Sequence, residues 1–244
     1  MHVQLVGLTK RFGSVVAVDD VTARVVPGQV TAFLGPNGAG KTTTLRMLLG
    51  LVRPTAGQAL LDGRRYDELE SPRRSVGALL GPDGFHRGRT GRDHLRVVAL
   101  AAGIGTARVD EVLELVELTP AADRRVGEYS LGMRQRLGLA CALLGDPEVL
   151  IADEPANGLD PEGIAWVREF FRRSAAEGRT VLVSSHFLAE VTRTADRVLV
   201  IDRGRLRFDG SLADLAATAD AAAGPDDAAA IETAFLRLTA EVAA

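Results

Sequence analysis

Short apolar runs near the start of the chain predict β-strands. Residues 3–8, 21–26 and 30–34 are rich in valine and other strand-forming residues, and the turn dipeptide Pro27-Gly28 separates the last two runs. We therefore expect antiparallel sheet in this part of the chain. A glycine-rich loop follows the third run directly, and after it come residues 43–51, whose leucines recur at helical spacing.

Similar runs return in the last third of the chain. Residues 149–152, 180–184 and 198–202 are short and mostly apolar, which is typical of strands buried on both faces of a parallel sheet. A helical pattern over residues 162–176 lies between the first two runs, and Arg203-Gly204 predicts a hairpin turn after the last. This order indicates an α/β core sheet.

The middle and the end of the chain carry helical patterns in place of strand-like runs. From about residue 85 to 145 the β-rich runs disappear, and helical patterns such as 109–118 and 132–144 replace them, which predicts an inserted helical subdomain. The tail is rich in alanine, and its apolar positions suit a final helix that docks, namely Ile231, Phe235 and Leu238. We expect one domain over residues 1–215, followed by an Ala-rich linker and C-terminal helix over 216–244.

Composition narrows the class of protein. Hydrophobic residues make up 46% and charged residues 25% of the 244, as in ordinary soluble domains, and the net charge of −3 gives no reason to expect nucleic acid as a partner. Cys141 is the single cysteine, which excludes an intramolecular disulfide and fits a reducing cytoplasm. We interpret Cys141 itself as a small buried apolar residue. No run approaches the ~18 to 20 apolar residues of a membrane span.

Only two of the 29 basic residues are lysines, Lys10 and Lys41, and the second lies in a motif. The segment after the third strand fits the pattern G-x-x-x-x-G-K-[S/T], in which backbone N–H groups close around phosphates, the lysine reaches the β and γ phosphates and the hydroxyl holds Mg²⁺. An ammonium enters such a loop more readily than a planar guanidinium. The expected nucleotide-binding residues are Gly35, Pro36, Asn37, Gly38, Ala39, Gly40, Lys41, Thr42 and Thr43, with Thr42 also a metal ligand. We interpret Lys10 as a solvated surface charge.

Polar residues follow two of the later strands. Asp153 and Glu154 stand at the carboxyl end of the run 149–152, the edge at which α/β sheets present ligands. Asp153 is suited to hold Mg²⁺ through water, and Glu154 to orient or deprotonate an attacking water. His186 follows the run 180–184 and is placed to donate to the γ phosphate, although a lone histidine is often structural.

These residues, taken with a further segment, resemble the ATP-binding subunits of ABC transporters. The segment Tyr129-Ser130-Leu131-Gly132-Met133 is similar to the LSGGQ signature of that family, and its Ser130 lies 23 residues before Asp153. The segment Gly158-Leu159-Asp160 resembles the D-loop of the family, and His186 resembles its switch histidine. The likeness covers about residues 3–210 and implies a P-loop NTPase core sheet with an antiparallel β subdomain and an inserted helical subdomain. Residues 17–57 and 129–160 are most similar to bacterial drug and antibiotic-resistance exporter cassettes.

The resemblance also implies roles for residues outside the phosphate loop. Two cassettes would pair head to tail, so that Ser130 and the backbone of Gly132 contact the γ phosphate of ATP held by the opposite subunit. Phe12, 29 residues before Lys41, would stack on adenine, and Asp160 would link the two sites. Taken without the resemblance, Ser130 is an ordinary helix cap, Phe12 a core residue and Asp160 a turn residue.

Two departures from the family pattern stand out. In the signature, Leu131 replaces the first glycine and Met133 the glutamine, while the serine and the second glycine remain. Gly81 stands where the family carries the Q-loop glutamine, so the side-chain contact to Mg²⁺ or water is missing. Our hypothesis is that the backbone or a water substitutes and that residues 81–84 still act as a hinge; Asp83 could compensate, but is better read as a turn residue.

The sequence therefore indicates a subunit that binds ATP with Mg²⁺, forms a homodimer and hydrolyses ATP to drive a separate integral-membrane permease, most simply an exporter. We expect it in the cytoplasm, on the inner face of the membrane. One alternative is a soluble ABC-type ATPase that does mechanical work on nucleic acid or a ribosome. Another is a P-loop phosphotransferase, which would lack the signature and need a second substrate pocket.

Overall fold

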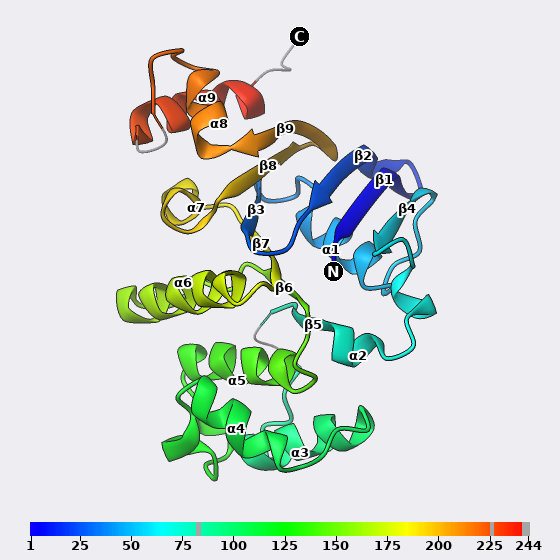
Figure 1. The fold of residues 1–244 in the computed structure, drawn as a ribbon, viewed down its shortest axis with the longest axis vertical. Coiled ribbons are helices and arrows are strands. Elements are labelled where there is room, and N and C mark those ends of the chain that lie inside the picture. Colours follow the sequence, from blue (N-terminus) through cyan, green and yellow to red (C-terminus); the bar gives the residue numbers. More distant parts are fainter. Residues whose placement is uncertain (82–83, 225–226, 241–244) are drawn as a thin grey trace. The chain divides into compact units, whose positions relative to one another are not determined.

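The computed structural model describes residues 1–81, 84–224 and 227–240, and these fall into two compact units. The first unit joins Met1–Leu69 to Arg168–Ala244, and the second is Glu70–Val167. The helices and strands of each unit are labelled in Figure 1. Within the described residues, no helix is both long and apolar enough to cross a membrane.

An antiparallel sheet of three strands forms one part of the first unit. Strand β1 (Val3–Phe12) lies between β2 (Val15–Val25) and β4 (Ala56–Leu61), in register so that Val3 faces Val25 on one side and Leu61 on the other. Buried and exposed residues alternate along the second half of β2, as expected for a strand with one face on a core and one face in water. The predicted antiparallel sheet is therefore present.

The prediction that the two strands on either side of the Pro27-Gly28 turn pair with each other is nevertheless wrong. Strand β3 (Val30–Leu34) pairs in parallel with β7 (Thr180–Ser185) and β8 (Arg197–Asp202), and not with β2. The reason is burial: all five residues of β3 are buried, which requires a sheet covered on both faces. Strand β9 (Arg205–Ser211) pairs antiparallel with β8, which confirms the hairpin at Arg203-Gly204.

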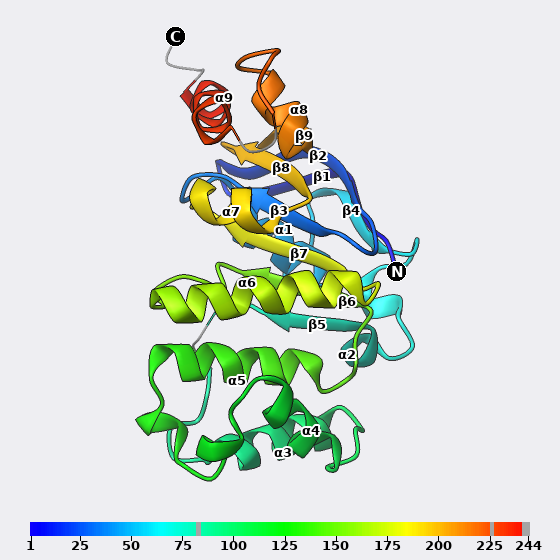
Figure 2. The same ribbon diagram turned by 60° about the vertical axis from the view of Figure 1, so that its left-hand side comes forward.

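Several helices of the first unit pack against its strands. Helix α1 (Lys41–Leu48) follows β3, α7 (Leu188–Thr194) follows β7, and α8 (Leu212–Ala217) and α9 (Ala228–Ala240) follow β9. Figure 2 shows α8 and α9 side by side next to β8 and β9. The predicted docking of the final helix is confirmed, because Ile231 is fully buried against residues of β3 and β8, while Phe235 and Leu238 pack at the edge of the same core.

In the second unit, helices pack against a pair of parallel strands, β5 (Val76–Leu79) and β6 (Val149–Asp153). Its helices are α2 (Pro72–Ser75), α3 (Gly91–Ala101), α4 (Arg108–Leu115) and α5 (Leu131–Leu143), and α6 (Pro161–Ala176) begins in this unit and ends in the first. Gly77 lets β5 approach α5 closely, since a Cβ there would collide with the carbonyl of Ala142. The predicted helical middle of the chain is thus observed.

Cys141 lies on α5 and is only partly exposed. Burial raises the pKa of its thiol to about 12, so the group stays protonated at neutral pH. This agrees with the interpretation of the cysteine as a small packing residue.

A histidine in the helical unit makes stability depend on pH. The ring of His94 packs edge-on against Phe85, with 5.0 Å between ring centroids, and its pKa is lowered by burial and by the nearby charge of Arg89. Because the native pKa lies below the ordinary value of 6.5, unfolding takes up a proton and stability falls as the pH drops below about 6.5. We expect the melting temperature of a His94→Gln variant to fall less between pH 7 and pH 5 than that of the unmodified protein. A His94→Gln variant whose melting temperature falls as much as that of the unmodified protein would contradict this expectation.

Candidate functional site

The phosphate loop lies between β3 and α1, and its shape depends on glycines. Gly38 has φ = 80° and Gly40 has φ = 109°, conformations that residues with a Cβ rarely adopt. Gly40 also caps α1 without a side-chain hydrogen bond of its own. Such a helix start, behind a glycine loop, is suited to bind phosphate.

Lys41 is held inside the loop. Its side chain is 5% exposed, and its Nζ donates hydrogen bonds to the carbonyl oxygens of Gly35 at 2.6 Å and Pro36 at 3.2 Å. A buried ammonium is stable only when it is hydrogen-bonded, so these two carbonyls and the lysine stabilise one another. The arrangement positions a positive charge under the loop where phosphate groups would lie.

Other parts of the first unit brace this loop. The carbonyl of Ala39 accepts a hydrogen bond from the N–H of Gly204 at 2.9 Å, and a Cβ on Gly40 would lie 2.5 Å from the carbonyl oxygen of Ala17. A Cβ on Gly35 would collide with the carbonyl of Ile201. The sequence pattern did not reveal these contacts, because Gly204 reads only as a hairpin glycine and Ala17 carries no signal.

His186 directly follows β7, at the same sheet edge from which the phosphate loop leaves β3. Leu34 pairs with Ser185 in parallel register, and the N–H of Gly35 donates to the carbonyl of Ser185 at 3.3 Å. The imidazole of His186 packs against the ring of Phe187 with 3.8 Å between centroids. The structure therefore places the histidine one residue beyond the strand that neighbours the phosphate loop.

Phe12 is not a core residue. It ends β1 with 52% of its surface exposed, and the Nζ of Lys10 lies 4.9 Å from the centroid of its ring. The same ammonium donates to the carbonyl of Arg53 at 2.7 Å in an exposed position, so Lys10 is a surface charge with a backbone partner. An exposed aromatic ring with a nearby cation is suited to stacking.

The acidic pair lies in the second unit, at the carboxyl end of β6. Asp153 is 8% exposed, and Glu154, directly after it, has φ = 50°. This left-handed conformation is uncommon for a glutamate and is typical of functional turns. The carbonyl of Glu154 accepts from the N–H of Asn157 at 3.1 Å, which closes the turn behind the strand.

Ser130 and Asp160 both cap helices. The Oγ of Ser130 accepts from the N–H of Met133 at 3.2 Å at the start of α5, and Oδ1 of Asp160 accepts from the N–H of Gly163 at 2.8 Å at the start of α6. Both residues are exposed. The interpretation of Ser130 as a helix cap is confirmed. Because the residue is exposed, it is also accessible to a ligand.

The signature segment and the D-loop segment lie side by side in this unit. A Cβ on Gly132 would be 3.7 Å from the side chain of Leu159, and a Cβ on Gly158 would be 2.5 Å from the side chain of Leu131. Leu131, which replaces the first signature glycine, therefore packs over Gly158, whose φ of 72° suits a glycine. This contact gives the departure in the signature a structural reason.

Gly81, in the Q-loop position, has φ = 118°, and a Cβ added there would meet no atom within 4 Å. Space is open, but the backbone conformation favours glycine. Asp83, considered as a compensating carboxylate or a turn residue, lies outside the described residues.

The described part of the chain contains no group of three or more His, Cys, Asp or Glu side chains that could hold a metal by themselves. Thr42 and Asp153 each carry an oxygen of the kind that binds Mg²⁺, but they belong to different units, so their shared role as metal ligands stays a prediction. Phe12, residues 35–43 and His186 belong to the first unit, and Ser130, Gly132, Asp153, Glu154 and Asp160 belong to the second.

Comparison with known proteins identifies relatives. The sequence model of a family described as ABC transporter matches residues 18–157, more than half of the chain. The bacitracin transport ATP-binding protein BcrA of Bacillus licheniformis is 45% identical over 203 residues, which cover 82% of this chain and 66% of that protein. The chain thus spans about two thirds of the length of that relative.

Another relative matches over most of both chains. The lantibiotic transport ATP-binding protein SrtF of Streptococcus pyogenes is 36% identical over 84% of this chain and 90% of its own length. A solved structure described as an ATP-binding subunit of an ABC transporter superposes with a TM-score of 0.83 at 29% identity, and covers 96% of this chain and 99% of that one.

The glycines of the loop allow a matched test. Gly28 and Gly38 have φ of 78° and 80°, and a Cβ at either position meets no atom within 4 Å, so alanine adds only backbone strain of about 1–2 kcal/mol at both. We expect Gly28→Ala and Gly38→Ala to lower the melting temperature equally, but only Gly38→Ala to weaken ATP binding, by about tenfold. Titration calorimetry with ATP measures the difference. Equal ATP affinities in the two variants would contradict the assignment of the loop.

Proposed function

Because the chain belongs to the ABC transporter family, we propose that it is the ATP-binding and ATP-hydrolysing subunit of a transporter, working with a separately encoded integral-membrane permease on the inner face of the membrane. The observation that carries this proposal is the phosphate loop, with Lys41 buried beneath it and braced from Ala17 and Gly204. The family follows from the matches to known ATP-binding subunits, and their ATP-binding names support the proposed ATPase activity.

Each site residue then has a chemical role. Lys41 and the N–H groups of the loop would hold the β and γ phosphates, and Thr42 and Asp153 are the residues that would hold Mg²⁺, which would neutralise phosphate charge during the reaction. Glu154 orients or deprotonates the attacking water, and His186 donates to the γ phosphate. The left-handed backbone at Glu154 supports this role, because it turns the chain sharply just after the buried strand.

The remaining residues serve a head-to-tail homodimer. Ser130 and the backbone of Gly132 contact the γ phosphate of ATP bound in the partner, at the N-terminal end of α5, where N–H groups attract an anion. Phe12 stacks on adenine, and Asp160 links the two sites. The exposure of Ser130, Asp160 and Phe12 supports these roles, since a group must be accessible before the dimer closes.

The proposed cargo is a peptide antibiotic or a similar drug, moved outward. Relatives named for bacitracin and lantibiotic transport support this class of cargo. The cargo contacts belong to the permease, so specificity is expected there and not in this subunit.

Replacement of Glu154 tests the hydrolytic mechanism. Glu154→Gln keeps the size of the side chain but removes the base, so hydrolysis should fall by about 10²- to 10⁴-fold while ATP still binds, and an ATP-bound dimer should accumulate. Phosphate release and light scattering with saturating ATP measure the two effects. Glu169→Gln, an exposed glutamate on α6, is the matched control and should hydrolyse ATP normally. A Glu154→Gln protein that stays monomeric would rule out the closed dimer.

Gly81 tests whether the missing glutamine matters. Because φ is 118° at Gly81, both Gly81→Ala and Gly81→Gln should destabilise the protein by a similar amount, about 1–3 kcal/mol. We expect both variants to keep nearly unchanged affinity for ATP with Mg²⁺, as measured by calorimetry. If Gly81→Gln bound ATP several-fold more tightly than Gly81→Ala, the side chain would be restoring a contact, and our hypothesis of backbone or water substitution would fail.

A further inference from the structure

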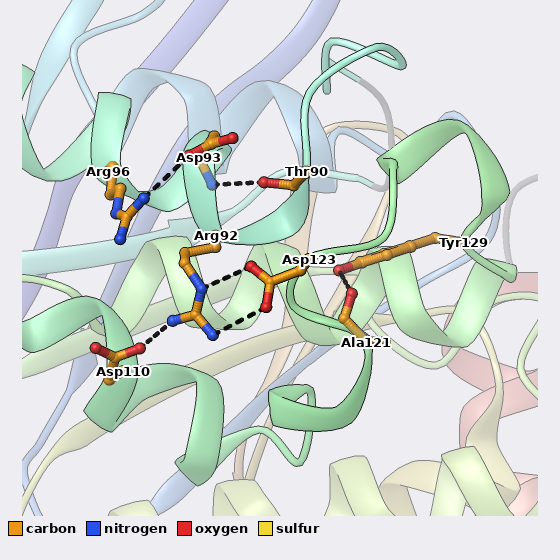
Figure 3. Close-up of polar contacts among 8 residues, drawn as sticks. All are labelled: Thr90, Arg92, Asp93, Arg96, Asp110, Ala121, Asp123 and Tyr129. Carbon is orange, nitrogen blue, oxygen red and sulfur yellow. Dashed lines mark hydrogen bonds and ion pairs between the residues drawn. The ribbon is translucent and has the colours of Figure 1, made fainter.

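The backbone that leads into Ser130 is anchored by the side chain before it. Tyr129 is 3% exposed, and its hydroxyl donates a hydrogen bond to the carbonyl of Ala121 at 2.7 Å (Figure 3). Gly91 makes room for this hydroxyl, because a Cβ there would collide with it. Burial raises the pKa of Tyr129, so the phenol stays protonated and able to donate.

The loop that holds Tyr129 is in turn fixed by Arg92. Figure 3 shows the guanidinium of Arg92, from α3, between Asp110 on α4 and Asp123 in the loop after it. Its Nε donates to Oδ1 of Asp123 at 2.8 Å, one terminal nitrogen lies 3.5 Å from Oδ2 of the same carboxylate, and the other bonds Asp110. The hydrogen bond from Arg92 is the main reason that the pKa of Asp123 is lowered.

Backbone contacts tie the same segments together. The N–H of Arg92 donates to the carbonyl of Ala122 at 2.9 Å, directly beside the residue that accepts from Tyr129. On the other side, the carbonyl of Tyr129 accepts from the guanidinium of Arg134 on α5 at 2.6 Å. Tyr129 is thus held at its ring and at its backbone, and Ser130 is the next residue.

We propose that Tyr129 and Arg92 are positioning residues for ATP hydrolysis, which set the place of Ser130 through the series Arg92, Asp123, Ala121, Tyr129. The inference rests on the proposed function, in which Ser130 contacts the γ phosphate bound by the partner. A displacement of about 1 Å in such a contact costs up to about a hundredfold in rate. The series also connects α3 and α4 to the signature segment, so a movement of these helices changes the position of Ser130.

The test is a double-mutant cycle. Tyr129→Phe removes only the hydroxyl, and we expect kcat for ATP to fall about tenfold while the affinity of each subunit for the fluorescent analogue TNP-ATP changes less than twofold. In a Ser130→Ala background the same change should have no further effect, because its target is already gone. Arg92→Gln should behave in the same way. Arg96→Gln, which removes the surface pair with Asp93 at 3.2 Å and leaves the hydrogen bonds from Arg92 to Asp123 in place, should leave kcat unchanged.

The outcomes separate the inference from the function on which it rests. If Tyr129→Phe and Ser130→Ala lower kcat independently, so that the double variant shows the product of both losses, Tyr129 acts through general stability and the inference is wrong. If Ser130→Ala hydrolyses ATP at the unmodified rate, the proposed role of Ser130 falls, and the inference falls with it. If Arg96→Gln lowers kcat as strongly as Arg92→Gln, any change of charge on α3 has this effect and the assignment to Arg92 is overturned.

Discussion

The burial of one ammonium group organises the site. A lysine that is only 5% exposed must be hydrogen-bonded, and Lys41 meets this requirement by donating to the carbonyls of Gly35 and Pro36, so the loop has to arch over it. That arch needs left-handed backbone at Gly38 and Gly40. It also needs support from outside, which comes from β2 at Ala17 and from the β8–β9 turn at Gly204. A single charge thus determines the conformation of the loop and the strands that must surround it.

In the second unit, two residues that are expected to contact nucleotide also stabilise the helices at whose starts they lie. Ser130 and Asp160 accept hydrogen bonds from the first turns of α5 and α6, which would otherwise have N–H groups without partners. Capping fixes the backbone beside each exposed side chain, so the geometry exists before any partner arrives. The cap and the contact are therefore not competing explanations of the same residue, and a substitution at either position is expected to affect both.

The errors made from the sequence have particular causes. Pro27-Gly28 is a genuine turn, but a turn dipeptide does not say which strand the chain joins next, and the full burial of β3 sends it between β7 and β8. Lys10 is a surface charge as predicted, but no local pattern links it to its partner, the carbonyl of Arg53, 43 residues away. Gly81 was seen as a missing glutamine, whereas its φ of 118° shows that glycine also meets a demand of the backbone.

Local patterns were enough to locate the glycine loop between β3 and α1, the acidic pair at the end of β6, the β8–β9 hairpin and the helical middle of the chain. In each of these, the residue types lie within a few positions of one another, and their order along the chain carries the chemistry. Contacts that join distant positions needed the folded chain: the bracing of Gly40 by Ala17, the packing of Leu131 over Gly158, and the link from Arg92 through Asp123 to Tyr129. A side chain's neighbours across such gaps depend on how helices and strands pack, and the spacing of apolar residues shows which face of an element is buried but not which residues that face meets.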